Sequence, residues 1–208
     1  MDYKRILRKT LKRVSKLEAP SAMDIGAYKG ALAENLLDMN PNAKIYLIEP
    51  NLSAINGRFA NNPNVTVSGL AISNYAYQTF YSGDKSRLSD SLFPKHLEGK
   101  AGKVASAKTA CVTMDGLMEK FRIKHLDFLV MNCEGGEYAA FETTDWLNVP
   151  DRILLQLHGN VPFDTREYRI KRRNIYLALE HNGFALTQGT IQVRHKGKIN
   201  QFWERPTP

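Results

Sequence analysis

The chain has 208 residues, and 29 Lys and Arg against 21 Asp and Glu give it a formal net charge of +8. Hydrophobic residues make up 43% of it, which is enough for a packed core and excludes an intrinsically disordered chain. No apolar run reaches the roughly 18 residues of a membrane-spanning helix, and the N-terminus lacks the apolar stretch of a signal peptide, so we expect a cytoplasmic protein. Two cysteines are too few for a disulfide scaffold and lack the CxxC spacing of a metal site.

Residues 1–18 predict a basic amphipathic helix. Its apolar residues recur at spacings of three and four and share one face: Tyr3, Ile6, Leu7, Leu11, Val14 and Leu17. The same segment holds seven Lys and Arg against two acidic residues. We expect the apolar face to dock on the domain and the basic face to be solvated. A helix lying on an anionic membrane or along phosphates is the alternative.

The positive charge is unevenly distributed along the chain. Residues 1–18 carry +5, residues 19–150 carry −2 and residues 151–208 carry +5. The basic ends leave RNA open as a partner, whereas the middle of the chain is slightly acidic.

From residue 19 onward, segments typical of strands alternate with segments typical of helices. The expected strands are 21–25, 44–48, 65–70, 126–131 and 153–157, and the expected helices are 31–39, 52–60 and 165–182. Such alternation predicts a mostly parallel sheet with right-handed crossovers. The last part of the chain, with strand patterns at 184–187, 191–194 and 201–203 and a turn at 195–198, predicts antiparallel pairing.

One long stretch interrupts this alternation. Residues 75–81 have the pattern of a further strand, and residues 82–106 form a polar Ser-, Gly- and Lys-rich segment with little periodicity. A substrate-facing loop and a passive excursion both remain open as interpretations of that segment. No internal repeat or linker divides the chain, so we expect a single domain over residues 19–208.

A glycine-bearing turn, Asp24 to Gly30, follows the first strand and precedes the first helix of the domain. A dinucleotide-binding turn that began at Gly26 would need glycine at positions 28 and 31, and the bulky Tyr28 argues against NAD or FAD. Gly26 and Gly30, with Asp24 before them and Glu49 after the second strand, instead suit a nucleoside ligand without a diphosphate. Glu49 can accept hydrogen bonds from a ribose diol and Asp24 can hold an ammonium group, so S-adenosylmethionine fits this pattern.

The order and spacing of five segments resemble those of the FkbM-type methyltransferases. The segments are 24–30 (DIGAYKG), 48–51 (IEPN), 69–73 (GLAIS), 112–115 (VTMD) and 126–137 (LDFLVMNCEGGE), and the resemblance runs from about residue 21 to residue 205. It implies an α/β, Rossmann-like class I methyltransferase fold, in which helices cover both faces of a seven-stranded, mostly parallel sheet whose last strand is antiparallel. It also implies S-adenosylmethionine as cofactor and O-methylation of a hydroxyl on a sugar or natural product.

The resemblance also assigns cofactor contacts by position. Asp24, Gly26, Ala27 and Tyr28 would border the methionine part, Glu49 the ribose, and Leu70 and Ala71 the adenine. Asn132 would be a further cofactor contact, but it replaces the Asp that is usual in the family. Because an amide is neutral and accepts no proton, weakened catalysis and a shift of the base to a neighbour both remain open.

Methyl transfer to a hydroxyl needs a base, and the candidate catalytic residues are His158, Glu134 and Glu137. All three follow strands whose carboxyl ends are expected to face the cofactor. A structural hydrogen bond for His158 and helix capping for the two glutamates are the alternatives. Asn132, Glu134 and His158 are also conceivable ligands of a divalent metal, but their spacing does not select one and we do not favour it.

Two groups of residues bear on the acceptor. Phe80, Tyr81, Phe93 and Trp203 are candidates for a pocket wall, although core packing is the more common fate of such residues. Arg166, Arg169, Lys171, Arg172 and Arg173 share one predicted helix, as a solvated face or as a site for a phosphorylated acceptor. We therefore expect an O-methyltransferase acting on a sugar, glycan or other small molecule. The alternatives are an RNA 2′-O-methyltransferase and a cofactor-binding protein with little turnover.

Overall fold

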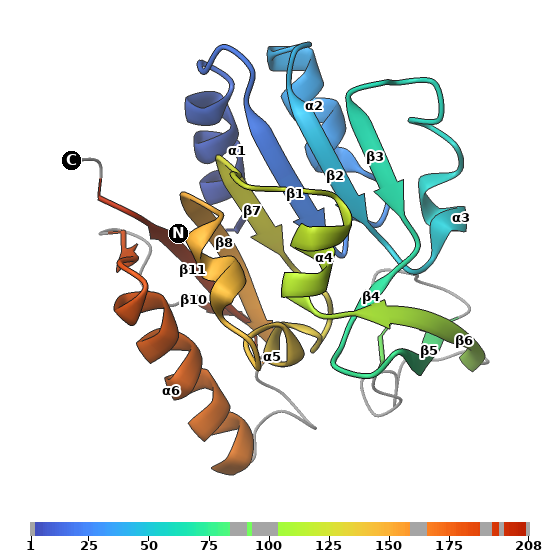
Figure 1. Cartoon of the computed structure of the whole chain (residues 1–208), viewed down its shortest axis with the longest axis vertical. Coiled ribbons are helices and arrows are strands. Elements are labelled where there is room, and N and C mark those ends of the chain that lie inside the picture. Colours follow the sequence, from blue (N-terminus) through green and yellow to red (C-terminus); the bar gives the residue numbers. More distant parts are fainter. Residues whose placement is uncertain are drawn as a thin grey trace.

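The computed structural model describes residues 3–83, 91–92, 104–158, 166–187, 193–195 and 198–206. Its centre is a sheet in which seven strands follow the order β3-β2-β1-β7-β8-β11-β10, and β9 pairs with β11 beside this path (Figure 1). The bounds are β1 Ser21–Ile25, β2 Lys44–Ile48, β3 Val65–Ser68, β7 Phe128–Met131, β8 Arg152–His158, β9 Ala185–Leu186, β10 Val193–His195 and β11 Lys198–Glu204.

The directions of the strands agree with the sequence-based prediction. The pairs β1–β2, β1–β7, β2–β3 and β7–β8 are parallel, whereas β11 runs antiparallel to both β8 and β10. All four residues of β7 are buried, as are the last four of β1 and β2, because helices cover the sheet on both sides. The mostly parallel sheet with an antiparallel last strand is thereby confirmed.

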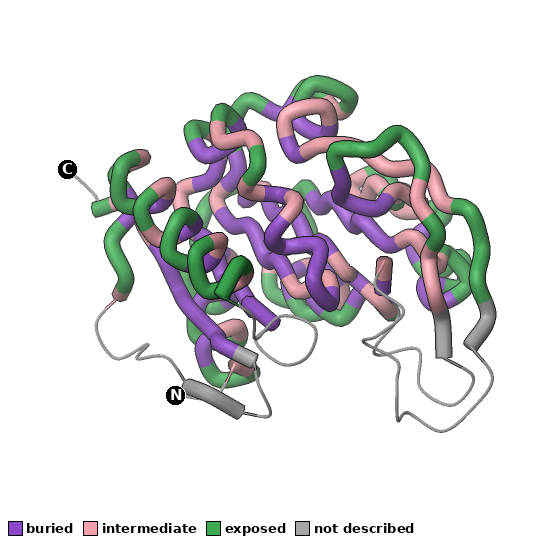
Figure 2. The backbone as a smooth tube through the Cα atoms, turned by 90° about the horizontal axis from the view of Figure 1, so that it is seen from below, coloured by how far each residue is buried: buried purple, intermediate pink, exposed green. Residues whose placement is uncertain are grey.

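Helices cover the two faces of the sheet separately. The helices on one face are α1 Tyr3–Val14, α2 Ala31–Met39 and α3 Leu52–Ile55. The other face carries α4 Met114–Lys120, α5 Glu137–Ala140, the 3-10 helix Asp145–Asn148 and α6 Arg166–His181. Each set of helices packs its apolar side chains on the strands, and the buried backbone in Figure 2 runs through the middle of the molecule.

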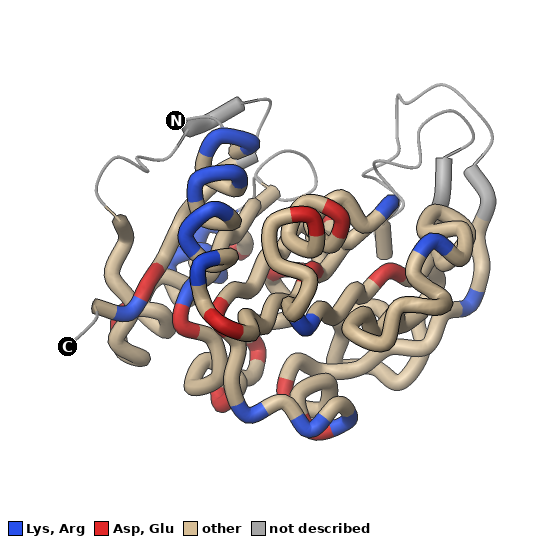
Figure 3. Tube along the Cα trace, turned by 90° about the horizontal axis from the view of Figure 1, so that it is seen from above, with Lys and Arg blue, Asp and Glu red and all other residues tan. Residues whose placement is uncertain are grey.

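Helix α1 docks on the sheet through its apolar face. Ile6, Leu11 and Val14 are buried with residues of α2 and the central strands. The seven Lys and Arg of residues 4–16 are all exposed, and Figure 3 shows basic positions on successive turns of the helix. Arg13 pairs with Glu204 of β11 at 2.7 Å. The docked helix with a solvated basic face is therefore confirmed over Tyr3–Val14, whereas Leu17 of the expected apolar face lies beyond the helix and is exposed.

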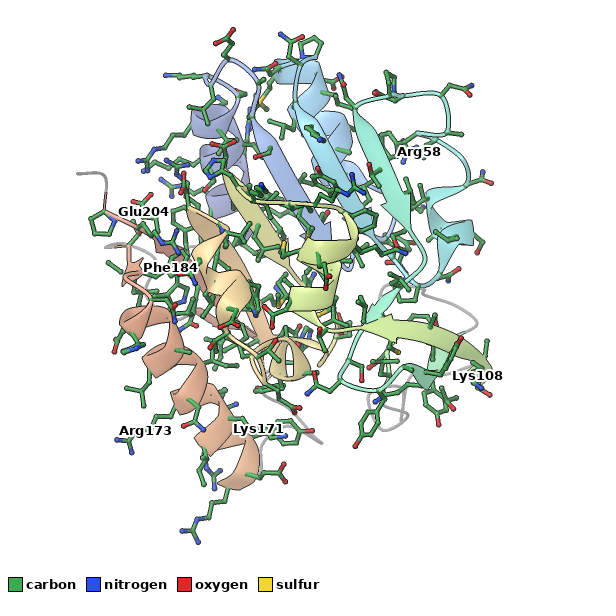
Figure 4. All side chains as sticks on the ribbon, viewed as in Figure 1. Arg58, Lys108, Lys171, Arg173, Phe184 and Glu204 are labelled. Carbon is green, nitrogen blue, oxygen red and sulfur yellow. The ribbon has the colours of Figure 1, made fainter. Side chains whose placement is uncertain are left out.

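A second sheet, which was not predicted as such, lies beyond the carboxyl end of β3 (Figure 1). Its strands are β4 Ala71–Ile72, β5 Tyr77–Gly83 and β6 Val104–Val112, in the order β4-β6-β5. The sequence indicated only β5, because β6 is built mainly from small and polar residues whose strand pattern is weak. The β5–β6 pair is antiparallel, and the ammonium of Lys108, a residue labelled on β6 in Figure 4, lies 4.6 Å from the centre of the Tyr77 ring.

Some expected bounds differ from those in the structure. Helix α3 ends at Ile55 rather than near Ala60, because Asn56 and Gly57 adopt left-handed conformations with φ of 49° and 66°. Most of the polar segment 82–106, including Phe93, lies outside the described residues, as does part of the turn expected at 195–198. Among the described residues, no helix is both long and apolar enough to span a membrane.

Candidate active site

The carboxyl ends of three neighbouring strands meet at one edge of the main sheet. Asn132, after β7, donates its backbone N–H to Ile25 O of β1 at 2.9 Å. Gly26 and Ala27, after β1, donate to Ile48 O of β2 at 2.9 and 3.2 Å. These bonds hold the turn after β1 between the segments that follow β2 and β7.

Gly26 is the point of closest approach in this turn. Its φ is +82°, and a Cβ placed on it would lie 2.1 Å from the backbone oxygen of Asn132. Any other residue would therefore be strained and would also collide with backbone, so this position requires glycine.

Glu49 organises the same turn from the end of β2. Its Oε2 accepts the backbone N–H of Tyr28 at 2.9 Å, and its Oε1 accepts that of Asn51 at 2.8 Å. Tyr28 has a left-handed φ of 49°, a conformation that costs a non-glycine residue about 1–2 kcal/mol. The bond to Glu49 helps to hold Tyr28 in it, so the carboxylate is fixed within the site before any ligand binds.

A cleft opens at this edge and encloses about 670 Å³ of empty space, its open mouth included. It is lined by Ile25, Gly26, Tyr28, Glu49, Pro50, Leu70, Ala71, Ile72, Phe80, Leu92, Asn132, Cys133, Glu134 and Gly136. Eight residues that were predicted from sequence are thus brought together on one surface: Gly26, Tyr28, Glu49, Leu70, Ala71, Phe80, Asn132 and Glu134.

Other predicted residues lie behind the cleft wall. Ala27 packs in the core against the helices of the α1 face, and Gly30 lies against Phe59 and Leu47. Asp24 is buried beneath the turn, where burial, together with the nearby charge of Glu49, raises its pKa to about 7. Asp24 therefore gains or loses its charge near neutral pH.

Glu134, His158 and Glu137 form a buried cluster next to the cleft. His158 Nδ1 lies 2.7 Å from Glu137 Oε1, and Nε2 lies 3.2 Å from Glu134 Oε2. The side chains of His158 and Glu137 are 0% exposed, and only Glu134 lines the cleft. The hydroxyl of Tyr138 donates to the backbone oxygen of His158 at 2.6 Å, which fixes the end of β8. The imidazole is held on both sides by carboxylates.

The charge state of His158 differs from the sequence-based expectation. Burial lowers its pKa, but the charges of Glu137 and Glu134 and their hydrogen bonds outweigh burial and raise the pKa to about 9. A base must be unprotonated to accept a proton, which an ordinary imidazole with a pKa near 6.5 is at neutral pH. In the structure, His158 is instead a cation at neutral pH that neutralises one of its two carboxylate neighbours.

The loop from Cys133 to Gly136 shapes the rest of this wall. Glu137 accepts the backbone N–H of Cys133 at 3.1 Å and that of Gly135 at 2.8 Å, so it ties the loop as well as pairing with His158. Glu134 and Gly135 have positive φ values of 49° and 108°. Burial, followed by the charge of Glu137, raises the pKa of the Cys133 thiol well above its ordinary value, which makes it a poor nucleophile.

Several lining residues escaped the sequence analysis. Pro50 and Ile72 lie within two of the segments that carry the family resemblance, but nothing in their type marks them as ligand contacts. Leu92 comes from the polar segment whose role was left open, and it reaches the cleft together with the predicted wall residue Phe80. Trp203, by contrast, is a core residue.

The basic cluster on α6 is only partly a solvated face. Arg166, Arg169 and Arg173 are exposed, and Arg173 points away from the domain (Figure 4). Arg172 is buried and interacts with Tyr138, so its function in the structure includes packing α6 on α5.

The cleft fits the cofactor that was expected from the sequence. Asn132 Oδ1 is buried and finds no hydrogen-bond partner among the described residues, so it is free to accept a bond from a ligand. Glu49 presents a fixed carboxylate for a diol, and Leu70, Ala71 and Ile72 give an apolar surface for a base. A divalent metal fits less well, because both ring nitrogens of His158 already contact carboxylates.

Comparison with known proteins identifies the family. A family model described as the methyltransferase FkbM domain matches residues 24–187, and no curated protein matches the chain. The chain is similar to a solved precorrin-6y C5,15-methyltransferase from Geobacter metallireducens, with a TM-score of 0.53 and 13% identity over 98% of this chain and 88% of the other.

Two further solved structures have the same fold. An rRNA methylase from Streptococcus thermophilus gives a TM-score of 0.55 and 11% identity over 100% of this chain and 98% of the other. Fibrillarin from Aeropyrum pernix with bound S-adenosyl-L-methionine gives 0.50 and 12% over 97% and 75%. At such identities the likeness shows the fold alone, whereas the family model covers most of the chain. The chain belongs to the FkbM methyltransferase family and is an S-adenosylmethionine-dependent methyltransferase of the class I fold.

Proposed function

We propose that this methyltransferase transfers a methyl group to a hydroxyl of a sugar, glycan or other small-molecule acceptor. The observation that carries the proposal is the carboxylate of Glu134 on the cleft wall, backed by the buried pair of His158 and Glu137. A hydroxyl is a poor nucleophile until it loses its proton, and this cluster offers a base beside the cofactor site.

The charges of the cluster support Glu134 as the base. His158 is a cation at neutral pH and forms its shorter contact, 2.7 Å, with Glu137. The two glutamates and the imidazolium together carry a net charge of −1, and Glu134 is the member on the cleft surface. A proton taken up by Glu134 brings this buried group to neutrality, which low polarity favours.

The reaction balances with the residues at hand. S-adenosylmethionine in this cleft would supply an electrophilic methyl group and would leave as S-adenosylhomocysteine. Glu134 accepts the hydroxyl proton as the acceptor oxygen forms its bond to the methyl carbon. His158 keeps Glu134 oriented, Glu49 holds the ribose, and Phe80 and Leu92 exclude water from one side of the cleft.

Cofactor binding is tested first, by calorimetry with S-adenosylmethionine and S-adenosylhomocysteine. Glu49→Gln keeps the shape of the side chain but removes its charge, so we expect at least tenfold weaker binding of both. Glu119→Gln, on the exposed side of α4, is the matched control and keeps wild-type affinity. Full affinity in Glu49→Gln would contradict the assignment of Glu49.

Acceptor and base are tested with radiolabelled cofactor against panels of glycans, other hydroxylated natural products and RNA. With an accepted substrate, Glu134→Gln is expected to lower kcat by about 10²–10⁴ with little change in cofactor affinity, because a general base contributes that much. Glu119→Gln again serves as control. Transfer to RNA only, or an unchanged kcat in Glu134→Gln, would refute the proposal. Activity gained only in Asn132→Asp would instead favour a binding protein with little turnover.

RNA is the second candidate acceptor, because α1 exposes its basic side along its whole length (Figure 3). Arg166, Arg169 and Arg173 of α6 add exposed cations on the opposite face of the sheet. Binding that uses these cations would weaken steeply with salt, and the slope of log K against log salt would count the phosphates contacted. A flat salt dependence would remove RNA as the acceptor.

A further inference from the structure

Ser91 connects the small sheet to the loop from Cys133 to Gly136. Its backbone pairs with that of Tyr81 through two hydrogen bonds, Ser91 N–H to Tyr81 O at 2.9 Å and Tyr81 N–H to Ser91 O at 2.8 Å. Its hydroxyl donates to the backbone oxygen of Glu134 at 2.7 Å. Ser91 is 1% exposed and Glu134 is 6% exposed, so water does not compete for these bonds.

The bond from Ser91 falls on a residue in an unfavourable conformation. Glu134 has a φ of 49°, which costs about 1–2 kcal/mol for a residue with a side chain. Such a conformation persists only where the surroundings fix it, and a buried carbonyl without a partner would add a further cost. The Ser91 hydroxyl supplies that partner on the carbonyl side, and Glu137 supplies one for the next residue by accepting Gly135 N–H at 2.8 Å.

The same bond relates the two sides of the cleft. Phe80 precedes Tyr81 and Leu92 follows Ser91, and both side chains line the cleft. Glu134 lines the cleft from the main sheet and lies 3.2 Å from His158. The Ser91–Glu134 bond therefore fixes the position of the apolar wall relative to the Glu134 carboxylate. An acceptor has to pack on the wall and place its hydroxyl at the carboxylate at the same time, so this relative position determines its alignment.

We propose that Ser91 is a positioning residue, whose hydroxyl holds the Glu134 backbone so that the Glu134 carboxylate stays on His158 and faces the acceptor. The proposal rests on the proposed function for the role of Glu134 as base. Its structural part concerns the free protein and can be measured without an acceptor.

The first test is the titration of the histidine rings by NMR. The groups that act on the His158 ring are Glu134 and Glu137, and together they raise its pKa to about 9. If Ser91 holds Glu134 in place, Ser91→Ala lowers the pKa of His158 by at least half of the change seen in Glu134→Gln. The double variant Ser91→Ala/Glu134→Gln then titrates like Glu134→Gln alone, because the charge to be positioned is gone.

Two serine controls separate positioning from general damage. Ser91→Thr keeps the hydroxyl and is expected to restore the wild-type titration. Ser15→Ala removes an exposed hydroxyl that also bonds a backbone oxygen, that of Lys12 at 3.3 Å, and is expected to change nothing. The proposal would be overturned if His158 kept its wild-type pKa in Ser91→Ala. It would also be overturned if Ser91→Ala lowered that pKa by the same amount in the Glu134→Gln background as in wild type. If Ser91→Ala does not fold, the His158 titration is compared between Ser91→Thr and Ser91→Cys instead. The thiol of the cysteine is a weak donor, so the pKa of His158 is expected to be lower in Ser91→Cys than in Ser91→Thr.

The second test is turnover of an accepted substrate. Ser91→Ala is expected to lower kcat about tenfold with less than threefold change in the dissociation constant of the cofactor, and to have no further effect in Glu134→Gln. A shifted His158 titration with unchanged kcat would retain the positioning role and refute Glu134 as base. If Ser91→Ala left the His158 titration unchanged and still lowered kcat when added to Glu134→Gln, the proposed enzyme function would stand and the positioning role of Ser91 would be refuted.

Discussion

The pH dependence of unfolding tests the charge state of the cluster formed by Glu134, His158 and Glu137. The pKa of His158 is raised from 6.5 to about 9 in the folded protein. Because the folded pKa lies above the unfolded one, the protonated imidazole stabilises the fold fully below pH 6.5. That contribution falls as pH rises and is gone above pH 9. At 1.36 kcal/mol per pKa unit, a shift of this size amounts to about 3 kcal/mol.

The assay is urea unfolding of wild type and of His158→Gln between pH 7 and 9.5. Part of that contribution is already gone at pH 7, so wild type is expected to lose about 2 kcal/mol of unfolding free energy in this window, and the variant is expected to lack that loss. The variant is less stable overall, since two buried carboxylates lose their cation, but only the slope is compared. His125→Gln removes a histidine whose side chain is 55% exposed and should keep the wild-type slope. Parallel curves for wild type and His158→Gln would refute the assignment of His158 as a buried cation.

Two further predictions concern the turn after β1. Gly26→Ala places a Cβ 2.1 Å from the Asn132 backbone oxygen, so we expect it to abolish cofactor binding in calorimetry and to lower the melting temperature far more than Gly57→Ala. Gly57 has a similar φ of +66° but open space around it, so it reports the left-handed cost of about 1–2 kcal/mol alone, and equal effects of the two would refute the collision. Since the pKa of Asp24 is about 7, a cationic ligand held by its ionised form should bind about 25-fold more tightly at pH 7.5 than at pH 5.5. Asp24→Asn should remove this dependence, and a variant that kept it would show that another group titrates.

The central strands were predictable because their signal is local. Residues 21–25 and 44–48 are short apolar runs bounded by turn residues, and the structure has β1 and β2 with these bounds. The N-terminal helix was equally clear, since its apolar spacing and its burial coincide. The strand β6 was missed, because residues such as Ser106, Lys108 and Thr109 carry little periodic hydrophobicity and are ordered by pairing with β5.

The sequence was enough to predict which residues meet at the site, but not the charge that each of them carries there. The turn of Gly26 and the acidic Glu49 follow strands whose ends must lie together in a parallel sheet, so their meeting follows from the fold. The high pKa of His158 depends instead on distances of 2.7 and 3.2 Å to residues more than twenty positions away. The contact of Ser91 with Glu134 depends on a long segment folding back, and no local pattern encodes it.

The strand order also sets when the cleft can form as the chain is made. β1 lies between β2 and β7, so its second edge has no partner until Phe128–Met131 has been synthesised, about 100 residues after β1. During that interval the apolar strand Ser21–Ile25 presents an open edge, which favours pairing with other chains. Chains that stop before β7 are therefore expected to aggregate, and only synthesis through β8 brings His158 to Glu134. The residues that line the cleft extend only to Gly136, so cofactor binding is expected to become possible once β7 has been made, before the rest of the sheet.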